Sequence, residues 1–477
     1  MAADRGRHSS LKAPPVLAGV RGLLYGPRRM PDVLPFRGIR YAASRAATLS
    51  RLIAPPYDSV SPVSRDELAA RSPHNLIHVT LGKDQPGDGP TDNKYLRAAQ
   101  AFEGWLADGT LRGDPEPALY PLEQSFTGPD GRPRVRRGLI AACRLHAYKE
   151  GIVLPHEKTL TAPKADRLEL LKRVKANLSP IFALYEDEGA EGHRALEAAI
   201  AGAGEPVAEA DSDDGTRHRL WRVEEPGAVE TLRRVLTARK AFIADGHHRY
   251  ESALAYRDLV DREAPGLGPD AGHRFIMMTL CSMADPGLVI YPTHRLLTGL
   301  TSFELGRFLD QLGRFFTVDT LIEDLHRPAG RAWAVARLAE HSGKSTAFLM
   351  VSGEDGKGRI LTLRDDADLA GVPLPRNVTL RELDVTALHS IVFQHLLGLS
   401  QRSQELGENV RYEMDAGEVV TRTLSGEHQL GFLVNPTPMW QVQAVAESGE
   451  TMPQKSTFFY PKLASGLVMR RIHEDLR

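Results

Sequence analysis

The sequence predicts an α+β fold of the mixed α/β type, and three observations support this prediction. Short apolar runs with strand character alternate with segments whose apolar residues recur at helical spacing. The order of these segments is not the strict strand-helix-strand repeat of a doubly wound sheet. The length of 477 residues is more than one ordinary compact core needs. We therefore expect two structural units.

The first part of the chain contains most of the predicted strands. We expect strands at 75–81, 118–126, 136–148 and 179–186, and helices at 92–109 and 165–178. The polar and acidic stretch at 208–219 indicates a surface loop or a hairpin turn. Further strands are expected at 240–245 and 287–297, and the apolar spacing of 247–260 predicts a helix between them.

After about residue 300 the predicted elements change. The expected order is amphipathic helices at 303–316 and 331–341, a hairpin at 345–364, a helix at 380–398, a buried strand at 429–438, and a loop, short strand and terminal helix at 452–471. We accordingly expect three regions. They are a disordered basic tail at 1–30, an α+β core at 31–300, and an α/β C-terminal domain at 301–477, more helical in character, that packs on the core.

The composition argues against two classes of partner. The chain has 60 Lys and Arg against 61 Asp and Glu, so neither nucleic acid nor a membrane surface is expected. No stretch is apolar enough to span a bilayer. Cys143 and Cys281 lie in apolar segments, and Arg21 interrupts the apolar stretch at 16–25 where a secretory signal would lie. These features favour a cytoplasmic protein that binds a small molecule.

Two stretches resemble nucleotide motifs but lack the required context. "GKST" at 343–346 has Leu338 where a Walker A loop needs glycine, and it precedes a strand instead of following one. "GLGPDAG" lacks both the spacing of a dinucleotide fingerprint and the strand before it. We therefore expect no NAD, and no haem or structural zinc either.

The stretch "FIADGHHRYESALAY" at 242–256 places polar residues between a strand and a helix. Gly246 supplies a tight turn, and the free N–H groups of the first helical turn attract an anion. His247, His248 and Arg249 add donors at the same place, which predicts a phosphate or carboxylate pocket. Asp245 either caps the helix or binds a Mg²⁺ that the phosphates also contact. The alternative is that Asp245 caps and both histidines pack inside.

A second polar cluster follows a predicted strand. His156, Glu157 and Lys158 lie in a loop position where functional sites tend to occur, and Lys164 and Arg167 open the next helix. Glu157 or His156 suits a general base, and the cations suit phosphate. The alternative for this stretch is a solvated turn.

Three smaller features complete the candidates. The loop "IAPPYDSVSP" is stiffened by its prolines, and it either directs Asp58 toward a ligand or is only a rigid turn. Two further loop segments carry polar residues: Thr293, His294 and Arg295 in "PTHRLL", and Lys455, Ser456 and Thr457 in "MPQKSTFFYPK".

Six separated motifs occur in an order that resembles one protein family. They are "IAPPYD", "PHEKTL…PKADRLELLK…ANLSPIF", "IADGHHRYESAL", "GLVIYPTHRLL", "GFLVNPTP" and "MPQKSTFFYPKL". From about Pro31 to its end, the chain resembles the prokaryotic domain-of-unknown-function 1015 (DUF1015) family, whose activity is not settled.

The strand, "DGHHR" and the following helix also resemble the signature of the ParB/sulfiredoxin-like superfamily, in which this turn binds nucleotide phosphates. Its archaeal free-serine kinase carries a similar stretch and transfers phosphate from ADP to the hydroxyl of L-serine. The resemblance implies a ParB/sulfiredoxin-like core with extra strands and helices. It also implies that Asp245, Gly246, His247, His248 and Arg249 hold phosphates and metal. No segment predicts the basic recognition helix of the DNA-binding members.

Together, the residues and the resemblance favour a kinase that transfers phosphate from ATP or ADP, with Mg²⁺, to a small hydroxylated metabolite such as serine. The first turn of the helix, with Lys158 or Lys164, would hold the phosphates. Glu157 or Asp58 would orient and deprotonate the acceptor, since phosphoryl transfer asks mainly for positioning and charge neutralisation.

Two other functions remain open at this point. The first is a nucleotide-binding regulatory protein of the ParB-like type without turnover. The second is a metal-dependent hydrolase that uses His156, Glu157 and one of His247 and His248, because adjacent histidines diverge on a helix.

Overall fold

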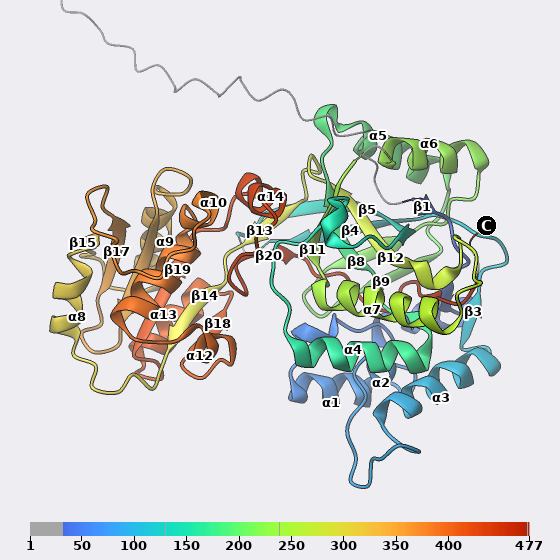
Figure 1. The fold of residues 1–477 in the computed structure, drawn as a ribbon, viewed down its shortest axis with the longest axis horizontal. Helices are drawn as coiled ribbons and strands as arrows, with labels where there is room; N and C mark the ends of the chain where they lie inside the picture. The colour runs from blue at the N-terminus through green and yellow to red at the C-terminus, as the bar shows by residue number, and fades with distance from the viewer. Residues whose placement is uncertain (1–31, 129, 238, 475, 477) are drawn as a thin grey trace, which may run out of the picture.

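The computed structural model describes residues 32–128, 130–237, 239–474 and 476, which form two lobes (Figure 1). The tail predicted at 1–30 lies outside the described residues. Each lobe contains a large β-sheet, and helices pack around both sheets. The predicted mixed α/β fold is therefore confirmed.

The first lobe is built on a nine-stranded mixed sheet. Its strands are β1 (Val33–Leu34), β4 (Tyr120–Thr127), β5 (Pro133–Arg144), β6 (Val153–Leu154), β8 (Ile181–Tyr185), β9 (Ala208–Asp211), β10 (Arg217–Leu220), β11 (Ala241–Asp245) and β12 (Phe275–Ser282). The order is β6-β11-β8-β12-β5-β4-β10-β9, with β1 also paired to β5. β11 runs parallel to β6, and β12 runs parallel to β8. The stretch at 208–219, predicted to be a surface loop or a hairpin turn, contains the antiparallel hairpin of β9 and β10.

Helices cover this sheet and its edges. They are α1 (Pro62–Arg71), α2 (Ile77–Thr80), α3 (Lys94–Ala107), α4 (Thr161–Val174), α5 (Glu191–Gly202), α6 (Pro226–Leu236) and α7 (His247–Glu263). Figure 1 shows α5 and α6 along one side of the lobe, and α4 beside α7, on which it packs. Short 3-10 helices occur at Ala43–Arg51, Tyr57–Ser59, Tyr148–Glu150, Glu188–Ala190 and Gly272–Arg274.

The buried strands explain the continuous apolar runs in the sequence. Phe182 and Leu184 of β8 face one hydrophobic cluster, whereas Ile181 and Ala183 face a second cluster on the other side. A strand that is covered on both faces needs apolar residues at every position. The sheet therefore lies inside the lobe, with α7 starting directly from the end of β11.

The second lobe is built on a six-stranded antiparallel sheet of order β15-β17-β16-β19-β14-β18. These strands are β14 (His294–Leu297), β15 (Phe316–Thr320), β16 (Ala347–Ser352), β17 (Gly358–Leu363), β18 (Val410–Glu413) and β19 (Leu430–Val434). The accompanying helices are α8 (Leu305–Leu312), α9 (Pro328–Ala339), α10 (Val378–Arg381), α11 (Asp384–Ala387), α12 (Gln401–Glu405), α13 (Ala416–Leu424), α14 (Met439–Glu447) and a π-helix at Leu388–Leu396. β16 and β17 form the hairpin predicted at 345–364.

The chain passes between the lobes twice. β13 (Val289–Tyr291) leads into the second lobe and pairs with β20 (Phe458–Tyr460), which leads back. The second sheet thus begins at β14, before the boundary expected near residue 300. Residues after β20 return to the first lobe, so the division at 300 into two domains stays a prediction.

Small two-stranded sheets fasten the ends of the described chain. β2 (Ile39–Tyr41) pairs with β3 (Leu111–Gly113), and β7 (Ala176–Asn177) pairs with β21 (Arg470–Arg471). The buried guanidinium of Arg470 donates to Asn177 Oδ1 and to the carbonyl of Phe275, each at 2.9 Å. The returning segment is therefore part of the first lobe's interior.

Two predicted elements are wrong. Residues 75–81 contain the helix α2 instead of a strand, and Asn75 Oδ1 accepts from the backbone N–H of Ile77 at the start of this turn (2.9 Å). A short apolar run does not distinguish a strand from a buried helical turn. The terminal helix expected within 452–471 is absent from the described residues, because β21 takes its place in a sheet.

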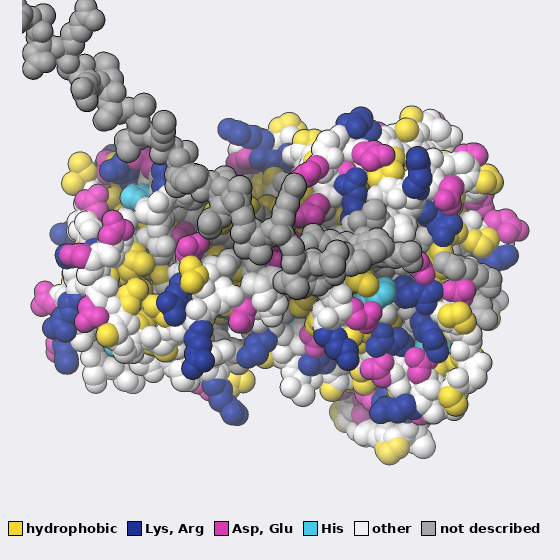
Figure 2. All heavy atoms as spheres, turned by 45° about the horizontal axis from the view of Figure 1, so that its top comes forward, with side chains coloured by type: hydrophobic (Ala, Val, Ile, Leu, Met, Phe, Trp, Pro, Cys, Tyr) yellow, Lys and Arg dark blue, Asp and Glu magenta, His cyan; other side chains and the backbone are white. Residues whose placement is uncertain are grey.

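The surface carries charges of both signs. Figure 2 shows basic and acidic side chains intermixed over one face of the molecule, as the near-zero net charge suggests. Within the described ranges, none of the helices has both the length and the apolar character needed for a membrane span.

Candidate functional site

The turn between β11 and α7 has the geometry that the sequence predicts. Gly246 adopts a φ of 95°, and a Cβ at this position would lie 3.0 Å from Ile181 Cδ1. Only glycine meets both conditions at low cost. No side chain caps α7, so Asp245 does not act as the predicted N-cap. The N–H groups of the first turn of α7 are therefore left without a side-chain partner.

This turn opens into a cavity of about 540 Å³. The cavity brings together the clusters at 156–158 and 245–248, which the sequence alone could not place relative to each other. Nine predicted site residues line it: Asp58, Glu157, Lys158, Asp245, Gly246, His247, His248, Thr293 and Lys455. Tyr412 and Met414 from the second lobe also line it, so the cavity lies where the two lobes meet.

His156 connects the two clusters from behind the cavity wall. Its backbone N–H donates to His247 Nε2 (3.3 Å), and the two rings lie edge to face with their centroids 4.8 Å apart. Its Nδ1 lies 2.7 Å from the carbonyl oxygen of Ile243, and its Nε2 lies 2.8 Å from Thr457 Oγ1. Burial lowers the pKa of His156, so the ring is neutral at pH 7.

His247 and His248 are neutral donors rather than cations. His247 Nε2 accepts from the backbone of His156, and His248 Nε2 accepts from the backbone N–H of Leu160 at 2.9 Å. A neutral imidazole whose Nε2 accepts carries its proton on Nδ1. Burial lowers the pKa of both rings. Each ring therefore carries one N–H group, on Nδ1, and no positive charge.

Asp245 is held by two cations. Lys462 Nζ contacts Oδ1, and Arg249 donates to Oδ2 at 2.9 Å. Burial by itself would raise the pKa of Asp245, but Lys462 and Arg249 outweigh it and hold this pKa below its ordinary value. Arg249 also binds Ser179 Oγ and the carbonyl of Pro180, and it does not line the cavity.

These contacts bear on where Mg²⁺ would bind. Both oxygens of Asp245 already face cations, so this carboxylate does not suit a metal ion. Glu157 Oε1 accepts from the backbone N–H of Lys455 (3.0 Å), while among the described residues Asp58 has no hydrogen bond or ion pair. No group of three His, Cys, Asp or Glu side chains in the described ranges forms a ready metal site. Asp58 and Glu157 fit Mg²⁺ better, since this ion commonly takes one or two carboxylates plus phosphates.

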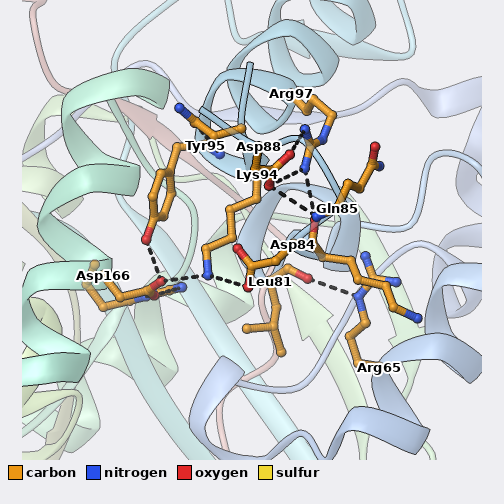
Figure 3. A network of polar contacts seen from close by, with 12 residues as sticks. Arg65, Leu81, Asp84, Gln85, Asp88, Lys94, Tyr95, Arg97 and Asp166 are labelled. Carbon is orange, nitrogen blue, oxygen red and sulfur yellow. Dashed lines mark hydrogen bonds and ion pairs between the residues drawn. The ribbon is translucent and has the colours of Figure 1, made fainter. Parts of the chain in front are cut away.

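A network of polar contacts supports the part of the cavity wall that contains Tyr57 (Figure 3). Tyr95 donates to Asp166 Oδ1 at 2.8 Å, and Lys94 Nζ lies 3.3 Å from the same oxygen. Asp166 pairs with Arg167, whose guanidinium stacks 4.1 Å above the centre of the Tyr57 ring. Tyr57 lines the cavity, whereas Arg167 does not. Arg167 thus supports the wall and does not reach a ligand there.

Four other predicted residues also lie outside the cavity. Lys164 pairs with Glu251 of α7 at 2.9 Å. His294 accepts from the backbone N–H of Val434, and Ser456 donates to the carbonyl of Pro453. Their side chains are structural contacts in this arrangement.

Arg295 is the fourth of these residues, and it acts on the cavity indirectly. Its side chain is fully buried and donates to the backbone carbonyls of Thr293 and Lys455, both of which line the cavity. Arg295 Nε also donates to His389 Nε2 (3.2 Å). The guanidinium therefore positions two segments of the wall from behind.

Sequence reasoning missed Lys462 and assigned no separate role to Tyr57 or Thr457. Thr457 and Lys462 belong to "MPQKSTFFYPKL", in which the sequence indicates Lys455, Ser456 and Thr457 as polar candidates but not Lys462. Tyr57 stands beside Asp58 in "IAPPYDSVSP". The motifs identified the correct segments, but only the fold shows which of their side chains face the cavity.

Comparison with known proteins places the chain in a family. Residues 33–386 match the family model described as "Protein of unknown function (DUF1015)". No curated protein matches the sequence.

Three solved structures match the fold of this chain at low sequence identity. "Free serine kinase in complex with AMP" is 12% identical with a TM-score of 0.33, covering 69% of this chain and 91% of that one. A conserved hypothetical protein from Pyrococcus furiosus is 12% identical with a TM-score of 0.32, covering 69% and 95%. SbnI with a C-terminal truncation from Staphylococcus aureus is 11% identical with a TM-score of 0.29, covering 69% and 81%. Because these TM-scores are low, we base the function on the side chains of the chain itself.

Proposed function

The chain belongs to the family of proteins of unknown function DUF1015, and from its cavity we propose that it is a kinase for a small hydroxylated metabolite such as serine, with ATP or ADP as donor. One observation carries the proposal. A single cavity joins the uncapped start of α7, three lysines and three carboxylates, of which that of Asp245 is paired with Lys462. Phosphoryl transfer requires this combination of anion binding and acceptor positioning.

The phosphates bind at the start of α7. The free N–H groups of its first turn attract an anion, and the Nδ1–H groups of His247 and His248 add neutral donors. Lys462, Lys158 and Lys455 supply positive charge around the same cavity. Asp245 acts by holding Lys462 in place.

The carboxylates act on the acceptor and the metal. Glu157 is oriented by the backbone of Lys455 and takes the proton of the acceptor hydroxyl. Asp58 would hold Mg²⁺ together with the phosphates. When bound, the ion neutralises charge on the transferred phosphoryl group.

The test is to incubate the purified protein with Mg²⁺, ATP or ADP, and a panel of amino and hydroxy acids. We expect nucleotide binding and one phosphorylated product. Glu157→Gln should lower kcat by about 100-fold or more and change nucleotide affinity little. Glu169→Gln on the outer part of α4 is the matched control and should behave as wild type. A folded protein that binds neither nucleotide and makes no product would disprove the proposal.

A regulatory function without turnover is the second candidate. The cavity is lined from both lobes, so a bound nucleotide would contact both and favour one arrangement of them. This candidate predicts tight nucleotide binding, a changed small-angle scattering profile and no product with any acceptor. Product formation would rule it out in favour of the kinase.

A further inference from the structure

A threonine hydroxyl in the cavity is hydrogen-bonded to a buried histidine. Thr457 Oγ1 lies 2.8 Å from His156 Nε2, although the two residues are 301 positions apart in the sequence. Thr457 lines the cavity beside Lys455 and Lys462. It also lies beyond the residues that match the family model.

The direction of this hydrogen bond follows from the other side of the ring. His156 Nδ1 lies 2.7 Å from the carbonyl oxygen of Ile243, and a carbonyl can only accept. Nδ1 therefore carries the proton, and Nε2 presents a lone pair. Thr457 must donate its hydroxyl proton to Nε2. This is the arrangement of a nucleophile beside a base that is oriented by a third group.

Both residues are held in place by further contacts. The backbone N–H of Met452 donates to the carbonyl of His156 (2.8 Å), and that of Lys455 donates to Glu157 Oε1. Thr437 Oγ1 donates to the carbonyl of Ser456 (3.1 Å). The segment that carries Thr457 is thus tied to the loop that carries His156, so their hydrogen bond is a fixed feature of the fold.

The other described serine and threonine side chains of the cavity lack this activation. Ser59 Oγ donates to the carbonyl of Pro56 at 2.7 Å. Thr293 lies in the wall fixed by Arg295, and no described hydrogen bond joins its hydroxyl to a histidine. Among the described serine and threonine hydroxyls that line the cavity, Thr457 is the one bound to an imidazole lone pair.

We propose that Thr457 is an internal phosphoryl acceptor, with His156 as its base. The proposal rests on the nucleotide binding proposed above. Thr457 Oγ1 attacks the terminal phosphorus of the nucleotide, and the new Oγ1–P bond forms. The bond from phosphorus to the bridging oxygen breaks, and that oxygen leaves with the electron pair as the shortened nucleotide. The hydroxyl proton passes to His156 Nε2. Lys455 and Lys462 neutralise the negative charge of the transferred phosphoryl group at the cavity wall.

The experiment uses the full chain with Mg²⁺ and ATP or ADP, and no acceptor metabolite. The reaction is quenched in acid, which a phosphothreonine ester survives, and the product is analysed by intact mass and peptide mapping. We expect one phosphoryl group, on Thr457. Thr457→Ser should be modified at the same position, and Thr457→Val should lose the modification. Thr421→Val, an exposed position of α13 outside the cavity, is the matched control and should be modified as wild type. His156→Gln should slow the modification by about 100-fold or more.

Nucleotide affinity, measured for every variant, separates the two proposals. A wild-type protein that binds nucleotide and phosphorylates a metabolite, but remains unmodified at Thr457, overturns this inference alone. Incorporation of phosphate into Thr457→Val as fast as into wild type also overturns it. A folded wild-type protein that binds no nucleotide overturns both proposals.

Discussion

At the scale of single residues, the roles in the cavity depend on neighbours that are distant in the sequence. Asp245 was expected to cap α7 or to bind metal, but Lys462 occupies one of its oxygens from 217 residues away. Likewise, the histidines of "DGHHR" lose positive charge because the fold buries them. Residue type predicted a phosphate pocket, and the packing decides which of these atoms face the cavity.

The backbone at Gly246 leads to a first prediction. Gly246→Ala places a Cβ at a φ of 95° and 3.0 Å from Ile181 Cδ1. We expect the free energy of unfolding to fall by about 1–3 kcal/mol, measured by urea denaturation. The control is Gly104→Ala in α3, where a Cβ meets nothing within 4 Å. That change should stabilise by about 0.5–1 kcal/mol. Equal effects of the two substitutions would contradict this account.

The charge of Lys462 leads to a second prediction. Lys462→Met removes a cation from the cavity and should weaken nucleotide binding about tenfold, or about 1.4 kcal/mol, in calorimetric titrations at fixed salt. Lys172→Met removes a cation from α4 that pairs only with nearby Glu169 among the described residues, and it should leave affinity unchanged. Equal losses in both variants would show that net charge alone matters.

At the scale of elements, the helix α4 holds the cavity wall through its first turns. Ser252 of α7 donates to the carbonyl of Lys164, and Lys164 pairs with Glu251, so α4 and α7 are joined by polar as well as apolar contacts. The network of Figure 3 adds α3 through Lys94 and Tyr95. Three helices therefore fix the position of Arg167 and, through it, Tyr57.

Asp166 is the centre of that network and gives a third prediction. Asp166→Asn leaves Arg167, Lys94 and Tyr95 without their shared carboxylate. We expect a loss of about 1–3 kcal/mol in the free energy of unfolding. Asp84→Asn removes a more exposed carboxylate that also contacts Lys94, and it should cost about 1 kcal/mol or less. Thermal or urea unfolding of both variants checks the difference, and a larger loss for Asp84→Asn would refute it.

At the scale of the whole molecule, stability depends on pH through buried neutral histidines. Burial lowers the pKa of His218 to about 4 and those of His294 and His389 to about 3. It also lowers the pKa values of His156 and His247. Above their ordinary pKa of 6.5 these groups are neutral in both states. Below 6.5 the unfolded chain takes up protons that the folded chain refuses, so stability falls as the pH falls.

This sign gives a fourth prediction. Between pH 6.5 and 4, the free energy of unfolding should fall with decreasing pH, and each buried histidine contributes at most about 1.4 kcal/mol per pH unit. His218 binds Ser212 Oγ and does not line the cavity, so His218→Gln tests one contribution. For this variant, the slope of the free energy of unfolding against pH should be smaller by the contribution of one histidine. Urea midpoints measured across the pH range give this slope. An unchanged slope would contradict the assignment.

Local patterns predicted most elements of the fold and the segments of the site. The hairpin at 345–364, the strand before Gly246 and the helix after it follow from periodicity and turn residues, which act over a few positions. The helix α2 and the strand β21 were mispredicted because each depends on tertiary contacts. Short segments have weak intrinsic preferences, so packing decides them.

By itself, the sequence determined the mixed α/β class, the strand-turn-helix at Gly246 and the polar segments that supply the site. These depend on neighbouring residues, whose spacing is written in the chain. The tertiary structure alone decided that the 156–158 and 245–248 clusters share one cavity, that Lys462 holds Asp245, and that Thr457 meets His156. Contacts across hundreds of residues depend on how the returning C-terminal segment packs against the first lobe, and burial then sets the charge of each group.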